Sequence, residues 1–580
     1  MNWDLGKLYS GFDDPNFAKD EARLSVCLDE VDQILTAGKQ PQETLCKALE
    51  GLLEAAEIMG AYGSYIFLTL ATEATSEPAL KCRDKMMRIG MHMSQCYSAL
   101  SRYLGGTQGL EEIIPSHPLL EEHAFMLKEM QQEALHTIDP ALEGVVLEMQ
   151  MNGGNAFSNL RDQLDAGHMV PYNGEKLPLS AIRNLAYDSD AAVRKAAYEA
   201  ELAAYPAMET PMAACLNAIK GEALTMCRLK KYESVLEMTL AESRMDRETL
   251  DTMLMVMREN LPHFRRYLKA KARYLGHEKG LPFYDLFAPI GGSGEKYTLE
   301  DAQKMLVEEL GAFSPQMGKM IRRSFAENWI DAYPREGKQG GAFCADSYRT
   351  RTSYVLTNYD GSLSDVDTLA HELGHAFHNE CLYTRSALNC GTPMPLAETA
   401  STFNEIVFVQ SMLKKADQDT RLHLLDEQLA DATQTIVDIL SRYIFETEVV
   451  SRRASQEMSP RELCQIMTEA QKETYGDGLD ENYLHPYMWA CKSHYYSTGS
   501  HFYNFPYAFG MLFGYGVYAC YQREGAAYEE KYKTLLSSSG IMKIYDVAMS
   551  AGIDLHDPEF WRSSMAGIVE KIDEFEEIIK

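Results

Sequence analysis

The spacing of apolar residues predicts that most of this chain is helical. Between Asp20 and about Leu104, apolar side chains recur at steps of three and four residues, and Ala, Glu, Lys, Leu and Met are common. The positions that share such a face are Leu24, Leu28, Val31 and Leu35, followed by Leu45, Leu49, Leu52 and Leu53. We therefore expect a layer of helices in the N-terminal part.

Proline-containing segments interrupt this pattern at residues 115–122 and 168–180, and each is a candidate boundary between helical units. A chain of 580 residues is too long for one ordinary core. We place the main division near Ala181, which predicts an N-terminal helical domain over residues 1–180 and a second domain over residues 181–580.

The character of the sequence changes between Arg335 and Tyr359. Here a glycine-rich turn is flanked by alternating Tyr, Val, Leu and Thr, which predicts a short hairpin or two edge strands. The glycines at 337–341 lack the GKS or GKT ending of a phosphate-binding loop. The expected fold class is mainly α, with a small β-sheet.

Composition narrows the possible partners and compartments. The formal net charge of −30 repels phosphate backbones and argues against a nucleic-acid partner, and no window resembles a membrane span. The first residues lack a signal peptide, and the 12 cysteines contain no CxxC pair, which favours reduced thiols. We expect a cytoplasmic protein with no obligate protein partner.

The segment TLAHELGHAFHNE, residues 368–380, carries the strongest chemical signal. On a helix, His371 and His375 are one turn apart, so both imidazoles can reach one metal ion, and Glu372 lies about 100° further round the axis. The opposite face is apolar and consists of Val366, Leu369, Ala370, Leu373, Ala376 and Phe377. This HExxH pattern is typical of zinc peptidases, in which the glutamate is the proton acceptor.

A third ligand must follow elsewhere in the chain. The metzincin pattern HExxHxxGxxH is excluded, because His378 and Cys381 occupy the positions of its glycine and last histidine. Glu380 lies on the same helix as the motif but points away from it.

Glu398 and Glu405 are the remaining acids before Asp417, and both lie in the helical stretch LAETASTFNE. We assign Glu398 as the third ligand and Glu405 as the carboxylate that orients a histidine. Asp367, one turn before His371, competes for the second role, and a solvated helix face is the alternative interpretation of Glu405.

These motifs resemble the thimet oligopeptidase and oligoendopeptidase F family of zinc peptidases, and oligoendopeptidase F most closely. The similarity extends to WDLGKLYSGFDDP at the start, to GKQGGAF, to the segment SYVLTNYDGSLSDVDTLAHELGHAFH, and to HFYNFPYAFGMLFGYGVY at residues 501–518. It covers nearly the full length of the chain.

The resemblance implies a two-lobed helical body with a deep channel and one Zn²⁺ at its floor. It also implies hydrolysis of internal bonds in short, unstructured peptides. A peptide could add to an edge strand at residues 340–344 and be held through its backbone.

The C-terminal motif contributes candidates that stabilise the developing oxyanion, namely His501, Tyr503 and Tyr507. Related enzymes often carry a tyrosine where this chain has Phe509, which leaves open which hydroxyl acts. Aromatic packing is an equal alternative for Tyr503.

Two other functions remain as alternatives. A non-haem di-iron protein could use the ExxH pair of Glu372 and His375 together with that of Glu133 and His136, but this interpretation leaves His371 unused. The other alternative is an inactive peptide-binding scaffold, against which the intact Glu372 argues.

Overall fold

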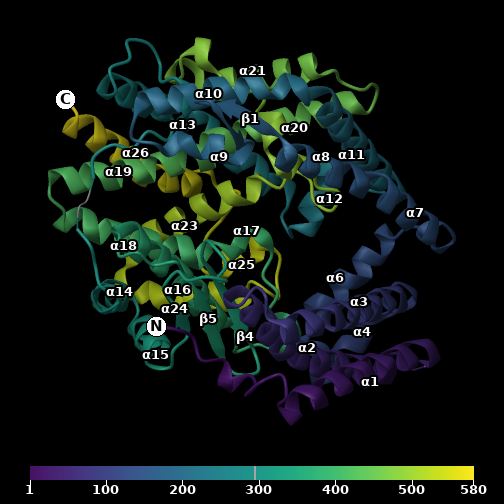
Figure 1. Cartoon of the computed structure of the whole chain (residues 1–580). Helices are drawn as coiled ribbons and strands as arrows, with labels where there is room; N and C mark the ends of the chain where they lie inside the picture. The colour runs from purple at the N-terminus through teal and green to yellow at the C-terminus, as the bar shows by residue number, and fades with distance from the viewer. Residues whose placement is uncertain (39, 293–294) are drawn as a thin grey trace. The chain divides into compact units, whose positions relative to one another are not determined.

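The computed structural model describes residues 1–38, 40–292 and 295–580, and these are mainly helical (Figure 1). The mainly α fold class with a small β-sheet is therefore confirmed. Within the described ranges, no helix combines the length and the apolarity that crossing a membrane requires.

The chain forms two compact units, and each is assembled from three segments. The first unit comprises Met1–Thr137, Glu295–Ser411 and Cys520–Ile553, and the second comprises Ile138–Gly294, Met412–Ala519 and Asp554–Lys580. These units are clusters of packed elements, whereas the predicted domains 1–180 and 181–580 are continuous stretches. The division near Ala181 therefore stays a prediction.

The first unit contains the N-terminal helices, the small sheet and the helix that carries the HExxH motif. Its helices are α1 (Pro15–Ala37), α2 (Pro41–Thr72), α3 (Glu77–Gly106), α4 (Leu110–Ile113), α5 (Pro118–Glu122), α6 (Ala124–Glu133), α14 (Leu299–Phe313), α15 (Pro315–Ala326), α16 (Leu363–Leu382), α17 (Met394–Ala397), α18 (Thr399–Lys415), α24 (Glu529–Ser538) and α25 (Ile544–Ser550). The end of α18 extends past Ser411 into the next segment.

The predicted N-terminal layer corresponds to α1, α2 and α3. The apolar positions of α1 from Leu24 to Leu35 are buried, as are Leu45, Leu49 and Leu52 of α2, and they form one core with residues of α3. Asp14 begins α1 by accepting a hydrogen bond from the backbone N–H of Asn16, with Pro15 at the first helical position. The periodicity of three and four residues thus predicted this core.

The small sheet has the strand order β3-β5-β4, with β3 at Ile330–Asp331, β4 at Phe343–Ser347 and β5 at Thr352–Leu356. Strands β4 and β5 are antiparallel, and Phe343 pairs with Leu356, so a hairpin forms in the predicted region. Its turn is at residues 348–351, and the glycine-rich segment that was expected to form the turn precedes β4. Strand β4 is at the edge of this order and lies beside α16 (Figure 1).

The second unit is built from helices around a separate core. They are α7 (Pro140–Asn152), α8 (Gly154–Gly167), α9 (Leu179–Asn184), α10 (Ala191–Ala204), α11 (Glu209–Leu229), α12 (Val235–Glu242), α13 (Arg247–Tyr274), α19 (Gln418–Ala432), α20 (Ile439–Arg453), α21 (Pro460–Tyr475), α22 (Met488–Cys491), α23 (Phe505–Glu524) and α26 (Pro558–Ile578).

This unit also contains a hairpin, in a segment where the proline and glycine pattern predicted only an interruption between helical units. Strands β1 (Met169–Tyr172) and β2 (Glu175–Pro178) are antiparallel and are joined by Asn173 and Gly174. Both linking residues have positive φ, 48° and 86°, as a type I′ turn requires. The Asn-Gly pair between two short strands was the signal that could have predicted it.

Candidate metal centre

Helix α16 begins with a capping box that fixes the register of the HExxH motif. The Ser362 hydroxyl accepts a hydrogen bond from the Asp365 N–H at 3.1 Å, and the Asp365 carboxylate accepts one from the Ser362 N–H at 3.3 Å. The apolar face of the helix is fully buried, as Val366, Leu369 and Phe377 illustrate. The two histidines of the motif consequently project from the other face.

Three side-chain atoms of the first unit converge at this face, two from α16 and one from the junction of α17 and α18. Nε2 of His371 lies 3.2 Å from Nε2 of His375, and Oε2 of Glu398 lies 3.3 Å from each of these nitrogens. Donors around a tetrahedral zinc ion stand about 3.3–3.6 Å apart when each bond is about 2.0–2.2 Å long. Two imidazole nitrogens and one carboxylate oxygen also form a donor set that zinc prefers. The residues therefore fit a zinc-type cation.

Glu405 fixes the tautomer of one histidine. The Nδ1–H of His371 donates a hydrogen bond to Oε1 of Glu405 at 2.9 Å. Because a carboxylate only accepts, Nδ1 carries a proton, and Nε2 is the ring nitrogen that is directed at the cluster. Asp367, the competing candidate, is half-buried one turn earlier on α16. The solvated-face interpretation of Glu405 does not fit this contact.

Close packing of α18 against α16 places the two glutamates. An added Cβ on Gly374 would lie 2.5 Å from the backbone oxygen of Ala400, so this approach depends on glycine. The buried Asn404 of α18 donates its side-chain N–H to the Ala370 carbonyl at 3.1 Å. These contacts join the second helix to the motif helix.

Ser401 orients the third donor directly, because its hydroxyl donates to Oε2 of Glu398 at 2.7 Å. Glu398 itself lies at the junction between α17 and α18. Ser401, Asn404 and the packing role of Gly374 were not predicted from the sequence. Only the glycine within HELGH offered a signal, as a small residue between two functional histidines.

Glu372 lies beside the donor cluster. Its side chain is almost fully buried, and among the residues that the structure describes its Oε2 has no hydrogen-bond partner. A cavity of about 450 Å³ is lined by Glu372, His371, His375 and Glu398 and reaches Phe343 of the edge strand. The free carboxylate oxygen and the three donors therefore border one space.

The electrostatics of the cluster favour a bound cation. Burial opposes charge on His371, but the carboxylates of Glu398 and Glu405 raise the pKa of this imidazole to about 11. Burial also opposes ionisation of Glu398, yet hydrogen bonds with the two histidines lower its pKa well below the ordinary value. Burial raises the pKa of Glu372. The carboxylates thus create a site of negative potential at the three donor atoms.

His378 is explained by packing. Its Nε2 lies 3.0 Å from the Ser539 hydroxyl and 3.2 Å from the Leu536 carbonyl oxygen, in the buried surroundings of α24. Burial, followed by the charge of His375, lowers the pKa of His378 to about 4. Glu380 points away from the cluster, as predicted, and forms an ion pair of 3.0 Å with Arg323.

The candidates of the C-terminal motif belong to the second unit. His501 is 3% exposed, and its Nδ1 lies 3.4 Å from Nζ of the fully buried Lys220. That ammonium group also forms an ion pair of 2.6 Å with Glu446. Burial lowers the pKa of His501 to about 3, and the charge of Lys220 acts in the same direction. This imidazole is therefore neutral, and Lys220 donates to its Nδ1.

The two tyrosines lie near the start of α23. Tyr503 stacks on His494 with ring centroids 5.1 Å apart, and it meets Tyr507 edge-on at 5.7 Å. Tyr507 is 36% exposed, whereas Phe509, at the position where relatives often have tyrosine, is fully buried. The stacking supports the packing interpretation of Tyr503, and alignment of these residues with the donor cluster stays a prediction.

Within the described part of the chain, two clusters of potential ligands have their donor atoms within 4.8 Å of one another. One is His371, His375 and Glu398, and the other is Asp32, His92 and Cys96. Glu133 and His136 belong to neither cluster. The geometry therefore gives no support to the di-iron alternative.

Comparison with known proteins places this site in a family. A sequence model of peptidase family M3 matches residues 184–567. Oligopeptidase PepF from Bacillus subtilis is 24% identical over 486 residues, which covers 81% of this chain and 71% of that relative. Group B oligopeptidase PepB from Streptococcus agalactiae is 27% identical over 399 residues, which covers 68% of this chain and 66% of that relative.

Solved structures share the fold. The crystal structure of oligoendopeptidase-F from Enterococcus faecium matches with a TM-score of 0.70 and 19% identity, over 97% of this chain and 99% of that chain. A crystal structure from Chlamydophila abortus, described as a peptidase, matches with a TM-score of 0.85 and 20% identity, over 100% of this chain and 98% of that chain.

The family's sequence model covers more than half of the chain, and the fold agrees over its whole length. The chain belongs to peptidase family M3. The resemblance to oligoendopeptidase F is confirmed, and membership of this family supports a peptidase function.

Proposed function

We propose that this chain is a zinc-dependent oligoendopeptidase that hydrolyses internal bonds of short, unstructured peptides. The observation that carries the proposal is the triangle of donor atoms from His371, His375 and Glu398, with separations of 3.2–3.3 Å, next to the buried carboxyl of Glu372. The oligopeptidases among its relatives support the same substrate class.

His371, His375 and Glu398 would hold one zinc ion. When bound, zinc supplies Lewis acidity for the peptide carbonyl and for the attacking water. Glu405 keeps the His371 proton on Nδ1, 2.9 Å away, so that Nε2 is available as a ligand. Ser401 holds the Glu398 oxygen from the other side. These two contacts hold the ligand side chains in place before zinc binds, which lowers the conformational entropy that is lost on binding.

Glu372 is proposed as the general base. Its Oε2 borders the same cavity as the three donors and makes no hydrogen bond to the described residues, so it can accept a proton from water. The carboxyl then returns that proton to the nitrogen of the leaving amine. Its buried position excludes most bulk water from the transfer.

The edge strand β4 is the proposed support for the substrate backbone. Its first residues, Phe343 and Cys344, line the cavity, and the outer side of β4 faces away from β5 in the strand order. An extended peptide that pairs with this edge is held by main-chain hydrogen bonds, which tolerate many side chains. An unstructured peptide can adopt this extended conformation without unfolding first, which supports unstructured peptides as the substrate class.

His501 and Tyr507 are the proposed donors to the oxyanion, with Tyr503 as the weaker candidate. Because Lys220 donates to Nδ1 of His501, the imidazole carries its own proton on Nε2 and can donate from there. A phenol or imidazole donor directed at the developing negative charge contributes selectively to the transition state.

A digest of peptides of mixed length, read by mass spectrometry with and without a chelator, tests the proposal. We expect internal cleavages that stop on chelation and return with zinc. Glu372→Gln should bind zinc and peptide and lose turnover by several orders of magnitude. Glu380→Gln is the matched control, because this residue lies on the same helix and pairs with Arg323. Undiminished cleavage by Glu372→Gln would refute the mechanism, and absence of cleavage in the wild type would favour a peptide-binding scaffold.

A further inference from the structure

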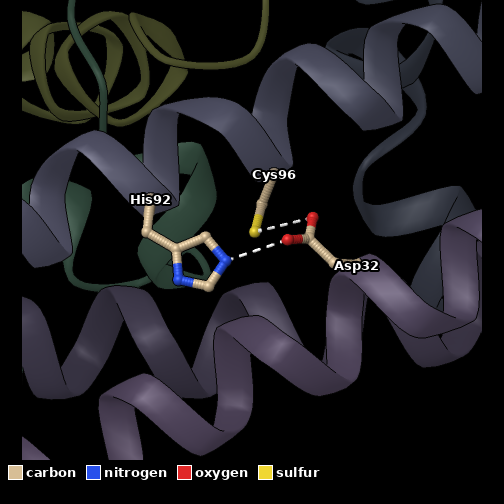
Figure 2. A group of neighbouring side chains, drawn as sticks. All are labelled: Asp32, His92 and Cys96. Carbon is tan, nitrogen blue, oxygen red and sulfur yellow. Dashed lines mark hydrogen bonds and ion pairs between the residues drawn. The ribbon is translucent and has the colours of Figure 1, made fainter.

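The second cluster of potential ligands lies between α1 and α3, in a part of the chain that the family's sequence model does not cover. His92 and Cys96 are one turn apart on α3, and Asp32 faces them from α1 (Figure 2). All three side chains point toward a common centre (Figure 2).

The distances within this cluster are those of a compact donor set. Nε2 of His92 lies 2.9 Å from one carboxylate oxygen of Asp32, and Sγ of Cys96 lies 3.4 Å from the other. Around a tetrahedral zinc ion, these nitrogen–oxygen and sulfur–oxygen separations are about 3.4 Å and about 3.6 Å. Small rotations of the side chains would therefore bring all three atoms to bonding distance.

A fourth donor is available one turn earlier on α1. Oδ1 of Asp29 lies 4.0 Å from Nε2 of His92, and this side chain is 67% exposed, so it can turn toward the cluster. The i, i+3 pair of aspartates on α1 then faces the i, i+4 pair of His92 and Cys96 on α3. Four ligands in this arrangement form a closed site of the structural kind.

The chemistry of these donors selects among cations. A thiolate and an imidazole favour zinc and its analogues over Mg²⁺ and Ca²⁺, which prefer oxygen ligands alone. Cys96 is fully buried, while His92 and Asp32 are partly exposed, so a cation can enter from the solvent side. Binding would replace the thiol proton of Cys96 and the Nε2 proton of His92 with bonds to the cation.

We propose that Asp32, His92 and Cys96, completed by Asp29, form a second zinc-type site that cross-links α1 to α3. This site is separate from the proposed peptidase centre and does not depend on that function. The competing explanation is a hydrogen-bonded trio, in which the thiol and the imidazole both donate to Asp32 without a cation.

Cobalt substitution of the full-length chain separates the two explanations, because the proposed peptidase centre contains no sulfur ligand. Cobalt(II) bound to a thiolate gives an intense charge-transfer band in the near ultraviolet. We expect this band in the wild type, and we expect it to persist when His371 is replaced by alanine, since the two centres are independent.

The band should be absent from Cys96→Ser and strongly reduced in His92→Ala, whose side chain is partly exposed and whose loss leaves the core intact. Cys27→Ser is the control: this cysteine is also fully buried, and its thiol donates to the Gly51 carbonyl at 3.0 Å. It should keep the band. Zinc content should fall from two ions per wild-type chain to one in Cys96→Ser.

Three results would overturn the proposal. They are a wild type without a sulfur–cobalt band, a band that survives Cys96→Ser, and a band that Cys27→Ser removes. A wild type that cleaves peptides but binds a single zinc would contradict this site while leaving the proposed peptidase function intact.

Discussion

Replacing Gly374 with alanine should loosen the metal centre without touching any ligand. The added Cβ would lie 2.5 Å from the Ala400 oxygen and 2.6 Å from Cα of Ser401. Both are backbone atoms and cannot rotate away. To reach ordinary contact at 3.4 Å, the backbone of α18 must retreat from α16 by about 0.9 Å.

That displacement is large for a metal site. Metal–ligand distances tolerate deviations of about 0.2 Å, and the Glu398 oxygen is carried by the segment that must move. Overpacking of this kind costs about 1–3 kcal/mol. If the strain is relieved by withdrawing Glu398, zinc affinity falls by about 5- to 150-fold. The fold should survive, because alanine favours a helix by about 1 kcal/mol relative to glycine and offsets part of the strain.

Competition with a chromophoric chelator measures the affinity, and thermal unfolding of the metal-free protein measures the fold. The matched control is Gly60→Ala in α2, where an added Cβ meets no atom within 4 Å. It should bind zinc as the wild type does and be slightly more stable. If Gly374→Ala binds zinc as tightly as Gly60→Ala, the close approach of α16 and α18 does not position the ligand.

Three further outcomes are expected. Glu405→Gln should weaken zinc binding by about 10- to 100-fold, because a neutral amide orients His371 less well, and unchanged affinity in the chelator assay would contradict this role. Tyr507→Phe should lower kcat by about 10²- to 10³-fold at full zinc content, so equal turnover would exclude its hydroxyl. Burial lowers the pKa of His501 to about 3. Below pH 6.5 the unfolded chain therefore binds more protons than the folded chain, and the free energy of unfolding decreases as the pH falls. Between pH 7 and pH 5 this histidine should lower the free energy of unfolding by about 2 kcal/mol, and His501→Gln should lack this contribution. If denaturant unfolding shows the same pH dependence for the wild type and the variant, this prediction is wrong.

Local patterns predicted the elements that are built from local physics. The apolar face of α16 predicted a helix from the sequence alone, and the spacing of the motif predicted that His371 and His375 lie together. The alternating residues around β5 likewise predicted strands in this region. In both cases, neighbours in sequence determine the geometry.

Contacts between distant segments were less accessible. Glu398 was selected because few acids follow the motif, but its position depends on Gly374, Asn404 and Ser401, which act through the packing of α18 on α16. No spacing rule reveals such an approach before the helices are placed. Lys220, which donates to Nδ1 of His501 and forms an ion pair with Glu446, is also far from both residues in sequence, so this contact was not predicted either.

The division of the chain into two units was not predictable from local patterns either. Each is made of three segments, so residues that share a core are separated by long stretches of chain. The cluster on α1 and α3 was not predicted either, because His92 and Cys96 match no metal-binding motif until the fold places Asp32 opposite them.

Anomalous diffraction at the zinc absorption edge, from crystals of the zinc-loaded chain, tests the proposed centre most directly. A peak should lie about 2.0–2.2 Å from Nε2 of His371, Nε2 of His375 and an oxygen of Glu398, with Glu405 still bonded to Nδ1 of His371. A zinc peak away from these three atoms, or one with Glu405 in place of Glu398, would contradict the proposed ligand set.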